Sequence, residues 1–329
     1  MSDLAIIIVS WNVQELLQAC LKTIETDLQD SNLSAQIWVV DNASTDQSVA
    51  MIKETFPQVK LIESEQNLGF AGGNNAALRA IGFEDQPNSS QGSQLPQAVL
   101  LLNPDTEIHQ GALQTLFNFL TSDSTAGIVG AKLIYGDGSF QHSGFGFPGL
   151  WQLAIDLLPV PGRLIESSLN GRYPLALYQQ GQPFPIGHPL GAAMMVRREA
   201  IQQAGLLDEA YHMYVEEVDW SKRITALGWN AYCVPEAVVT HFGGQSTGQI
   251  KTSSFLNLWR SRSQFYRKHY GPLKVWLATQ LVKIGMQRLK KADTEAVKQG
   301  QLTPEEQSER AACYQKIADI WQGGQASHV

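Results

Sequence analysis

The amino-acid sequence predicts an α/β protein with a mainly parallel central sheet flanked by helices and with a helical extension at the C-terminal end. Two observations predict this class. Short apolar runs alternate with segments of helical periodicity through the first half of the chain, a pattern that favours parallel strands joined by right-handed crossovers. These runs also end abruptly in polar loops, as buried parallel strands do. Ligands of such sheets bind beyond the carboxyl ends of the strands.

The first half of the chain is the more regular half. Its expected strands are rich in β-branched residues, and its expected helices carry apolar residues every three or four positions. Pro57 ends the second helix, and glycines open the third. In chain order, the expected elements are strand 4–10, helix 13–25, strand 35–40, helix 48–56, strand 59–63, helix 72–81, strand 98–102 and helix 110–120.

The second half has weaker periodicity. Residues 141–189 are rich in glycine, proline and aromatic residues, and we interpret them as an excursion that faces the substrate. From residue 292 the chain is polar and predicts a loosely held helix with a frayed tail. The other expected elements are strands 127–135, 191–197 and 229–234 and helices 198–204, 216–227 and 273–291.

Composition narrows the class of protein. The chain has 329 residues and a net charge of −7, which argues against a nucleic-acid-binding surface formed by the whole protein. The three cysteines are far apart and suit a reducing cytoplasm. The first apolar run is too short for a signal peptide, and no apolar run reaches the about 18 residues of a spanning helix. We therefore expect a cytoplasmic protein, either free or peripheral at the inner face of the cytoplasmic membrane.

The apolar run 98–102 breaks into Asn103-Pro104-Asp105. Proline cannot continue a central strand, so Asp105 should lie at the carboxyl end of this strand. A carboxylate in that position is suited to hold a divalent cation against a phosphate-bearing ligand. The alternative is that Asp105 caps the helix expected at 110–120.

The first two strands also end in polar residues. Strand 4–10 runs into Ser10 and Asn12, and the second strand runs into Asp41, which is followed by a loop of hydroxyl and carboxylate residues. Asp41 can accept hydrogen bonds from a base or a ribose. The alternative is a turn in which Asp46 caps the helix at 48–56.

Segment 67–75 contains three glycines and ends in Asn74 and Asn75. The glycines permit close approach of the backbone to a ligand. Their spacing does not match the dinucleotide-binding fingerprint, and no glycine-lysine-serine/threonine triplet occurs. The sequence therefore disfavours a dehydrogenase or a P-loop kinase.

Glu216, Glu217 and Asp219 lie at the start of an expected helix. Their mutual repulsion predicts a raised pKa or a cationic partner for at least one of them. Arg223 is spaced for an ion pair with Asp219, which would leave Glu216 and Glu217 free to face elsewhere. One of these two glutamates can then act as a general base, the alternative being a solvated acidic helix start.

His241 follows an apolar run and precedes two glycines. It is either a structural histidine or the second ligand of a metal site begun by Asp105. An imidazole combined with a carboxylate suits manganese.

Taken together, these segments resemble the family 2 glycosyltransferases, which have the Rossmann-like GT-A fold, and within them the bacterial rhamnosyltransferase-type members. The resemblance covers about residues 4 to 270, and it is the order of the motifs that makes it specific. The matching segments are 7–12, 40–46, 67–74, 102–105, 191–197, 216–219 and His241.

The resemblance implies an inverting transfer of a sugar from a nucleotide-diphosphate donor to a hydroxyl of a glycan or lipid-linked acceptor. Glu217 matches the catalytic base of the family. Asp105 stands where the family holds manganese or magnesium on the pyrophosphate, and His241 would complete the shell of the ion. The residues implied at the donor are Ser10, Asn12, Asp41, Asn74, Asn103 and Asp105.

Two residues depart from the family pattern. Asn103 replaces the first aspartate of the metal motif, and Glu217 replaces an aspartate base, so Glu216 remains the alternative base. These departures also leave open a catalytically degenerate module that binds a glycan or a nucleotide. A sugar-nucleotide pyrophosphorylase is disfavoured, because residues 10–14 contain neither glycine nor a cation.

The expected organisation is a GT-A domain at 1–250, with a nucleotide-binding half at 1–110 and an acceptor-binding half at 111–250, followed by a helical extension at 251–329. Helix 273–291 carries an apolar stripe beside several cations, which suits either an interfacial membrane helix or packing on the body or on a partner subunit. The basic segment 259–269 is either a packed helix or a site at which Arg260 and Arg262 meet a diphosphate. An oligomer is compatible with the sequence.

Overall fold

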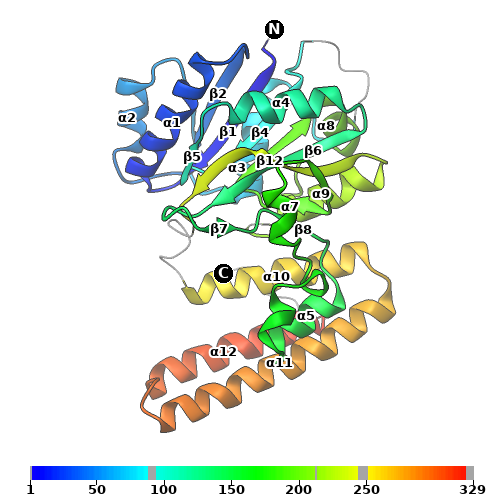
Figure 1. Cartoon of the computed structure of the whole chain (residues 1–329). Coiled ribbons are helices and arrows are strands. Elements are labelled where there is room, and N and C mark those ends of the chain that lie inside the picture. The colour runs from blue at the N-terminus through cyan, green and yellow to red at the C-terminus, as the bar shows by residue number, and fades with distance from the viewer. Residues whose placement is uncertain (1, 88–93, 212, 244–250, 324–329) are drawn as a thin grey trace. The chain divides into compact units, whose positions relative to one another are not determined.

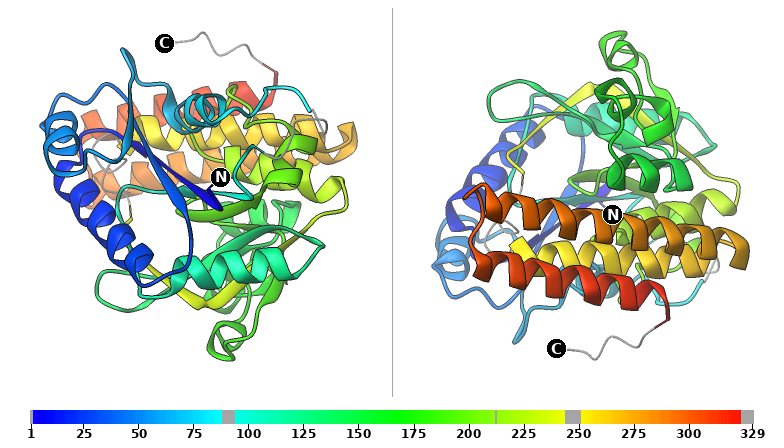
Figure 2. Two further views of the ribbon diagram at one scale, coloured as in Figure 1. Left: turned by 90° about the horizontal axis from the view of Figure 1, so that it is seen from above. Right: turned by 90° about the horizontal axis from the view of Figure 1, so that it is seen from below.

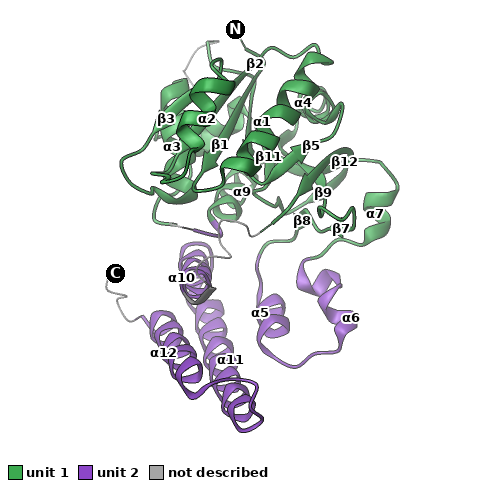
Figure 3. Ribbon diagram, turned by 90° about the vertical axis from the view of Figure 1, so that its left-hand side faces the viewer, with its two compact units in different colours: residues 1–147, 172–212, 216–248 green, residues 148–171, 213–215, 249–329 purple. Residues whose placement is uncertain are grey.

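The computed structural model describes residues 2–87, 94–211, 213–243 and 251–323. They form two compact units (Figure 3). Unit 1 comprises residues 1–147, 172–212 and 216–248, and unit 2 comprises 148–171, 213–215 and 249–329. The predicted end of the GT-A domain, residue 250, lies outside the described residues.

A mixed sheet forms the centre of unit 1 (Figure 1). Its strands lie in the order β3-β2-β1-β4-β11-β6-β12-β5, with β7 beside β6 and β9 beside β12. Along this order only β11 and β5 oppose the common direction, so the predicted mainly parallel sheet is confirmed. The strands are β1 Leu4–Ser10, β2 Ala35–Asp41, β3 Lys60–Glu63, β4 Ala98–Leu102, β5 Thr106–Ile108, β6 Ala126–Ile134, β7 Phe140–Gln141, β9 Phe184–Ile186, β11 Ala193–Arg197 and β12 Asn230–His241; β8 Gly144–Phe145 and β10 His188–Pro189 form a separate pair.

Helices cover both faces of this sheet, which explains why the central strands are apolar throughout. In β1, Leu4, Ile6 and Ile8 belong to one buried cluster, and Ala5 and Ile7 belong to the cluster on the other face. The first cluster includes side chains of α1, α2 and α4, and the second includes side chains of α3, α8 and α9. The helices of unit 1 are α1 Gln14–Gln29, α2 Ser48–Thr55, α3 Gly69–Ile81, α4 Ala112–Ser122, α7 Leu175–Gln179, α8 Arg198–Ala204 and α9 Glu216–Ala226.

Helix α3 begins three residues earlier than the predicted start at residue 72. Its glycines therefore lie within a helix, and Gly73 serves packing, because a Cβ there would lie 2.7 Å from a methyl group of Val9 on β1. Strand β12 is also longer than the predicted strand 229–234. It passes a register shift between Val234 and Val238 and ends at His241.

Unit 2 consists of helices. Figure 2 (right) shows α10, α11 and α12 side by side, in yellow, orange and red. The helix predicted to be loosely held is instead packed: the side chain of Trp321 is buried and its Nε1 donates to the carbonyl of Trp259 at 3.1 Å. The end of the predicted frayed tail lies outside the described residues. No described helix is long and apolar enough to cross a membrane. The helices are α5 Leu150–Leu157, α6 Gly162–Ile165, the 3-10 turn η1 Ser168–Asn170, α10 Lys251–His269, α11 Pro272–Lys298 and α12 Pro304–Trp321.

Candidate functional site

Ser10 and Asp41 end β1 and β2 and lie opposite each other in the sheet register. Both side chains are buried. One carboxylate oxygen of Asp41 accepts a hydrogen bond from the Ser44 amide at 2.9 Å, while its Oδ1 and the Ser10 hydroxyl have no partner within the described structure. Buried polar atoms are normally hydrogen-bonded, so this pair is poised to bind donors of a ligand.

Asn12 holds the loop that follows β2. Its backbone has a φ of 53°, in the left-handed region that asparagine tolerates. The backbone N–H of Asn12 donates to the Ser44 hydroxyl at 3.0 Å, and its side-chain Oδ1 accepts from the backbone N–H of Thr45 at 2.7 Å. Asp46 accepts from the first residue of α2, as the capping alternative predicted. The structure thus brings Asn12 beside the Asp41 loop and uses its side-chain oxygen there.

Asn74 lies in α3 and is buried. Its side-chain amide donates to the carbonyl of Phe70 at 2.9 Å, one helical turn earlier. The neighbouring Asn75 donates to the carbonyl of Leu207 and to Glu209, both at 2.9 Å, and so ties α3 to the segment that precedes α9. No hydrogen bond of the described structure joins Asn74 to the other candidate residues.

The Asn103-Pro104-Asp105 corner meets the end of β12. The carbonyl of Asp105 accepts from the Phe242 amide at 2.9 Å, and its Oδ1 lies 3.5 Å from Nε2 of His241. The side-chain amide nitrogen of Asn103 lies 3.3 Å from the same Nε2. Three of the predicted residues, far apart in the sequence, are therefore brought together.

The orientation of His241 is set by Gln141, a residue that the sequence analysis missed. Nδ1 of His241 lies 3.2 Å from Oε1 of Gln141, and both side chains are buried. Because Oε1 only accepts, Nδ1 is the donor of this contact, and Nε2 is left facing the Asn103 amide and the Asp105 carboxylate. A histidine held in this way is prepared to bind a cation. No local sequence signal marks Gln141.

The alternative that Asp105 caps the following helix is wrong. Helix α4 begins at Ala112, and its first amides are bound by Asp27 of α1, which accepts from Gly111 and, at 3.0 Å, from Leu113. The capping carboxylate thus comes from a helix distant in sequence. Asp105 is buried and its carboxylate faces His241 instead.

Glu216 and Glu217 begin α9. Glu217 packs against Gly191, where a Cβ would lie 3.4 Å from its Cγ, and the next residue, Ala192, accepts from the Asn103 amide at 2.9 Å. The segment just before β11 thus places the Glu217 side chain near the Asn103-Pro104-Asp105 corner. Gly191 belongs to one of the segments that resemble the family, but no local sequence signal predicts its contact with Glu217.

Burial raises the pKa of both glutamates. Desolvation and then the neighbouring Glu217 raise the pKa of Glu216, whose buried Oε2 has no partner in the described part of the chain. Desolvation raises the pKa of Glu217 to about 7, against smaller opposing effects of the amides of Glu217 and Val218. A carboxyl group that titrates near neutrality is suited to general base catalysis.

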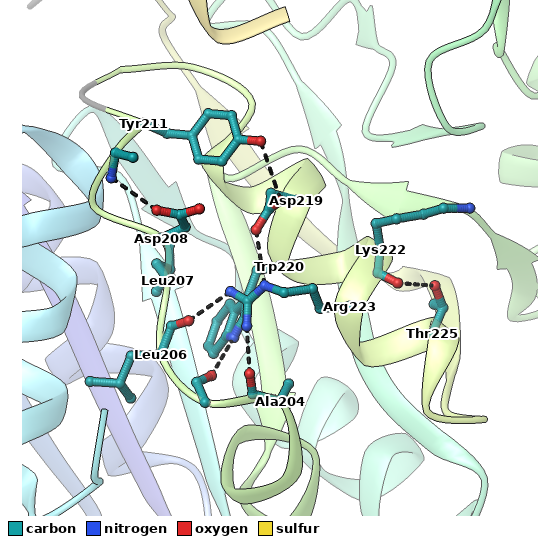
Figure 4. Close-up of polar contacts among 12 residues, drawn as sticks. Ala204, Leu206, Leu207, Asp208, Tyr211, Asp219, Trp220, Lys222, Arg223 and Thr225 are labelled. Carbon is teal, nitrogen blue, oxygen red and sulfur yellow. Dashed lines mark hydrogen bonds and ion pairs between the residues drawn. The ribbon is translucent and has the colours of Figure 1, made fainter. Parts of the chain in front are cut away.

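Figure 4 shows the polar contacts of the following residues of α9 with the segment between α8 and α9. Nε of Arg223 binds the carboxylate of Asp219 at 2.9 Å, which confirms the predicted pair. The same guanidinium donates to the carbonyls of Ala204 and Leu206, and Nε1 of Trp220 donates to the carbonyl of Gly205 at 2.8 Å. This network fixes α9 to the end of α8 and leaves Glu216 and Glu217 outside it.

The basic segment 259–269 belongs to α10 in unit 2. Arg262 pairs with Asp156 at 2.8 Å and lies over the ring of Trp259, so the packed-helix alternative describes this residue. Ser261 donates to the carbonyl of Met213 at 2.8 Å, just before the Tyr214–Val215 turn that leads into Glu216. Both turn residues have positive φ, of 68° and 72°, a strained conformation for these residue types.

Comparison with known proteins assigns the family. The sequence model of Glycosyl transferase family 2 matches residues 5–205, more than half of the chain, so the protein belongs to this family. It is 28% identical over 222 residues to N-acetylglucosaminyl-diphospho-decaprenol L-rhamnosyltransferase of Mycobacterium tuberculosis, covering 66% of this chain and 69% of the relative. It is 27% identical over 224 residues to low-salt glycan biosynthesis hexosyltransferase Agl10 of Haloferax volcanii, covering 68% of this chain and 62% of the relative.

Solved structures share the fold. A mannosyltransferase of Pyrobaculum calidifontis in complex with GDP-Man and Mn²⁺ has a TM-score of 0.53 at 14% identity, covering 97% of this chain and 86% of that one. GalNAc-T7 with UDP, GalNAc and Mn²⁺ has a TM-score of 0.54 at 16% identity; the likeness covers 81% of this chain but half the length of GalNAc-T7. The chain has the GT-A fold, and its family defines glycosyl transfer as the class of reaction.

Proposed function

We propose that this protein transfers a sugar from a nucleotide-diphosphate donor to a hydroxyl group of a glycan or lipid-linked acceptor by a single displacement that inverts the anomeric configuration. The observation that carries the proposal is Glu217, a partly buried carboxyl group that packs on Gly191 beside the corner of Asp105 and whose pKa desolvation raises to about 7. The family match supports the reaction class.

Glu217 is the proposed general base. It takes the proton of the acceptor hydroxyl, whose oxygen attacks the anomeric carbon while the bond from that carbon to the diphosphate breaks. The nucleoside diphosphate leaves on the opposite side. Glu216 remains the alternative base, because it is adjacent to Glu217 and desolvation also raises the pKa of its buried side chain.

Asp105 and His241 are the proposed ligands of a manganese or magnesium ion. These ligands suit such an ion, because Oδ1 of Asp105 lies 3.5 Å from Nε2 of His241. The side-chain amide nitrogen of Asn103 lies 3.3 Å from the same Nε2. When bound, such an ion neutralises charge on the leaving diphosphate. The described residues contain no group of three or more His, Cys, Asp or Glu side chains arranged for a metal, so donor phosphates would complete the shell.

The donor nucleotide is proposed to lie over the ends of β1 and β2. The unpartnered oxygens of Ser10 and Asp41 offer acceptors for its base and ribose. Asn12 contributes by holding the loop at Ser44 and Thr45. Asn74, bonded within α3, is kept as a proposed donor-side residue on the family motif alone.

Rhamnose is the donor sugar that we propose, and a lipid-linked glycan the acceptor. The support comes from the Mycobacterium tuberculosis relative, whose name specifies an L-rhamnosyltransferase acting on N-acetylglucosaminyl-diphospho-decaprenol. The protein would then contribute to cell-envelope polysaccharide synthesis and work at the cytoplasmic face of the membrane.

The test is release of nucleoside diphosphate from a panel of nucleotide-sugars in the presence of Mn²⁺ or Mg²⁺. We expect turnover with dTDP-rhamnose, and its loss in Asp105→Ala and Glu217→Gln. Glu236→Gln, which changes an exposed carboxylate on β12, is the matched control. Binding of a donor without turnover under any condition would favour the degenerate binding module instead.

A further inference from the structure

Helix α11 of unit 2 presents an apolar face that no described residue covers. The side chain of Leu273 is 71% exposed and that of Trp276 58%, and Leu277 and Ile284 are also exposed. Their spacing of three, four and seven residues places them on one side of the helix. The opposite side of α11 is buried within the unit and consists of Ala278, Val282, Gly285 and Met286.

Helix α5, which packs on α11 in the same unit, carries a second exposed aromatic ring. The hydroxyl of Tyr270 donates to the carbonyl of Pro148, and Nη1 of Arg288 donates to the carbonyl of Leu157 at 3.0 Å. The two helices therefore run in the same direction, and Figure 1 shows α5 beside α11. Trp151, 68% exposed near the start of α5, lies at the end where α11 begins.

The charge of α11 is opposite to that of the chain as a whole. Residues 272–291 contain five cations and no aspartate or glutamate, whereas the net charge of the protein is −7. Exposed leucine and tryptophan on one side of a helix, with lysine and arginine around them, are the features of a helix that lies in a membrane interface. The cations are Lys274, Lys283, Arg288, Lys290 and Lys291.

We infer that this surface, made by Leu273, Trp276, Leu277 and Ile284 and here named the α11 face, docks on a bilayer rich in anionic phospholipid. Its apolar side chains enter the boundary between headgroups and acyl chains. The surrounding lysines lie at the lipid phosphates, which attract juxtamembrane cations. The inference extends the proposed function, since a lipid-linked acceptor resides in such a bilayer, but vesicle binding requires no catalysis.

The experiment measures sedimentation of the full-length protein with vesicles of phosphatidylcholine alone or of phosphatidylcholine mixed with phosphatidylglycerol. We expect binding to the anionic vesicles only, weakened by salt, and about fivefold weaker for each cation among Lys283, Lys290 and Lys291 changed to glutamine. Trp276→Glu with Leu277→Glu should weaken it by about tenfold or more. Leu227→Glu, at an exposed leucine of unit 1, is the control and should bind as the parent does.

Three results would overturn the inference: equal binding to neutral vesicles, unchanged binding of the Trp276 and Leu277 double variant, or a dimer in analytical ultracentrifugation that this variant dissociates without a change in vesicle binding. The last result would make the α11 face a contact between two copies. Thermal unfolding checks that each variant is folded. Nucleoside diphosphate release, measured separately without vesicles, keeps failure of the catalytic proposal distinguishable.

Discussion

Two regions of unit 1 use their polar side chains in opposite ways. In the loops after β1 and β2, Asn12, Ser44, Thr45 and Asp46 satisfy one another and the backbone through hydrogen bonds of 2.7 to 3.0 Å. At the start of α9, Glu216 is buried with an unpartnered oxygen, and burial raises the pKa of both glutamates.

The difference separates side chains that stabilise a loop from side chains that are available for a reaction. Polar groups that bind each other stabilise a loop and have little capacity left for a ligand. Buried carboxylates without partners destabilise a fold, and proteins keep them mainly where their altered acidity is useful. On this criterion, Asp41 resembles the glutamates more than its own loop, because one of its buried oxygens has no partner in the described structure.

The largest expected effect follows from removing the base. Glu217→Gln keeps the shape of the side chain but not its ability to take a proton, so kcat should fall by about 10² to 10⁴. Glu216→Gln should reduce kcat less, because it is Glu217 that packs on Gly191 beside the Asp105 corner. Steady-state rates of nucleoside diphosphate release provide the comparison, and a larger loss in Glu216→Gln would exchange the two roles.

Asp105→Ala is expected to cost about 10² in kcat, because a metal-bound diphosphate leaves far more readily than a free one. With only Asp105 and His241 as charged or imidazole ligands, the protein alone should bind Mn²⁺ weakly and should bind it much more tightly with a nucleoside diphosphate present. Titration calorimetry with and without the nucleotide measures both. Tight Mn²⁺ binding by the free protein would contradict the proposed ligand set.

Titration of Glu217 should appear in the pH dependence. Its carboxylate is the active form, so activity should rise through about pH 7 and fall by about tenfold per pH unit below pH 6. The raised pKa also means that folding favours the protonated form, so stability is lost as the pH rises through 7. Glu217→Gln should therefore melt at a higher temperature than the parent at pH 8 and at the same temperature at pH 4.

Much of the fold was predictable because both faces of the sheet are covered. Strands such as β1 and β4 are then apolar at every position, and their ends are marked by polar residues. Strand β5 is only three residues long and carries no such pattern. The full extent of β12 was missed because Pro235 interrupts the run, which the structure accommodates with a register shift.

The features of the candidate site likewise divide into those that the sequence predicts and those that it does not. The positions of Asp41, Asp105 and His241 at strand ends could be predicted, because apolar runs that stop at polar residues mark where buried strands end. The contacts of Gln141 with His241 and of Asp27 with α4 could not be predicted, since no local sequence signal marks Gln141 or Asp27. Packing of α12 was likewise not predicted, because its buried side chains, Cys313, Tyr314, Ile317 and Trp321, are few and lie in a polar stretch.

Asn12→Ala tests the framework side of the comparison. The change removes the bond from Thr45 and places alanine at a φ of 53°, which alanine tolerates less well than asparagine. We expect a loss of about 2 kcal/mol in the free energy of unfolding, with kcat nearly unchanged. Chemical denaturation and steady-state kinetics measure the two quantities. A large fall in kcat at an unchanged free energy of unfolding would contradict this and would assign Asn12 a role in the reaction.

The smallest expected effect concerns Ser261, which holds the strained turn before Glu217 through the carbonyl of Met213. Ser261→Ala removes one hydrogen bond of about 1 kcal/mol, so we expect kcat to fall by about fivefold at an unchanged KM for the donor and the pH midpoint to shift. Ser261→Thr should restore both. Ser263→Ala, at a second buried serine of α10, controls for general loosening of the helix. If both alanine variants lowered kcat equally, Ser261 would be a packing residue, and the orientation of Glu217 would be set within α9 alone.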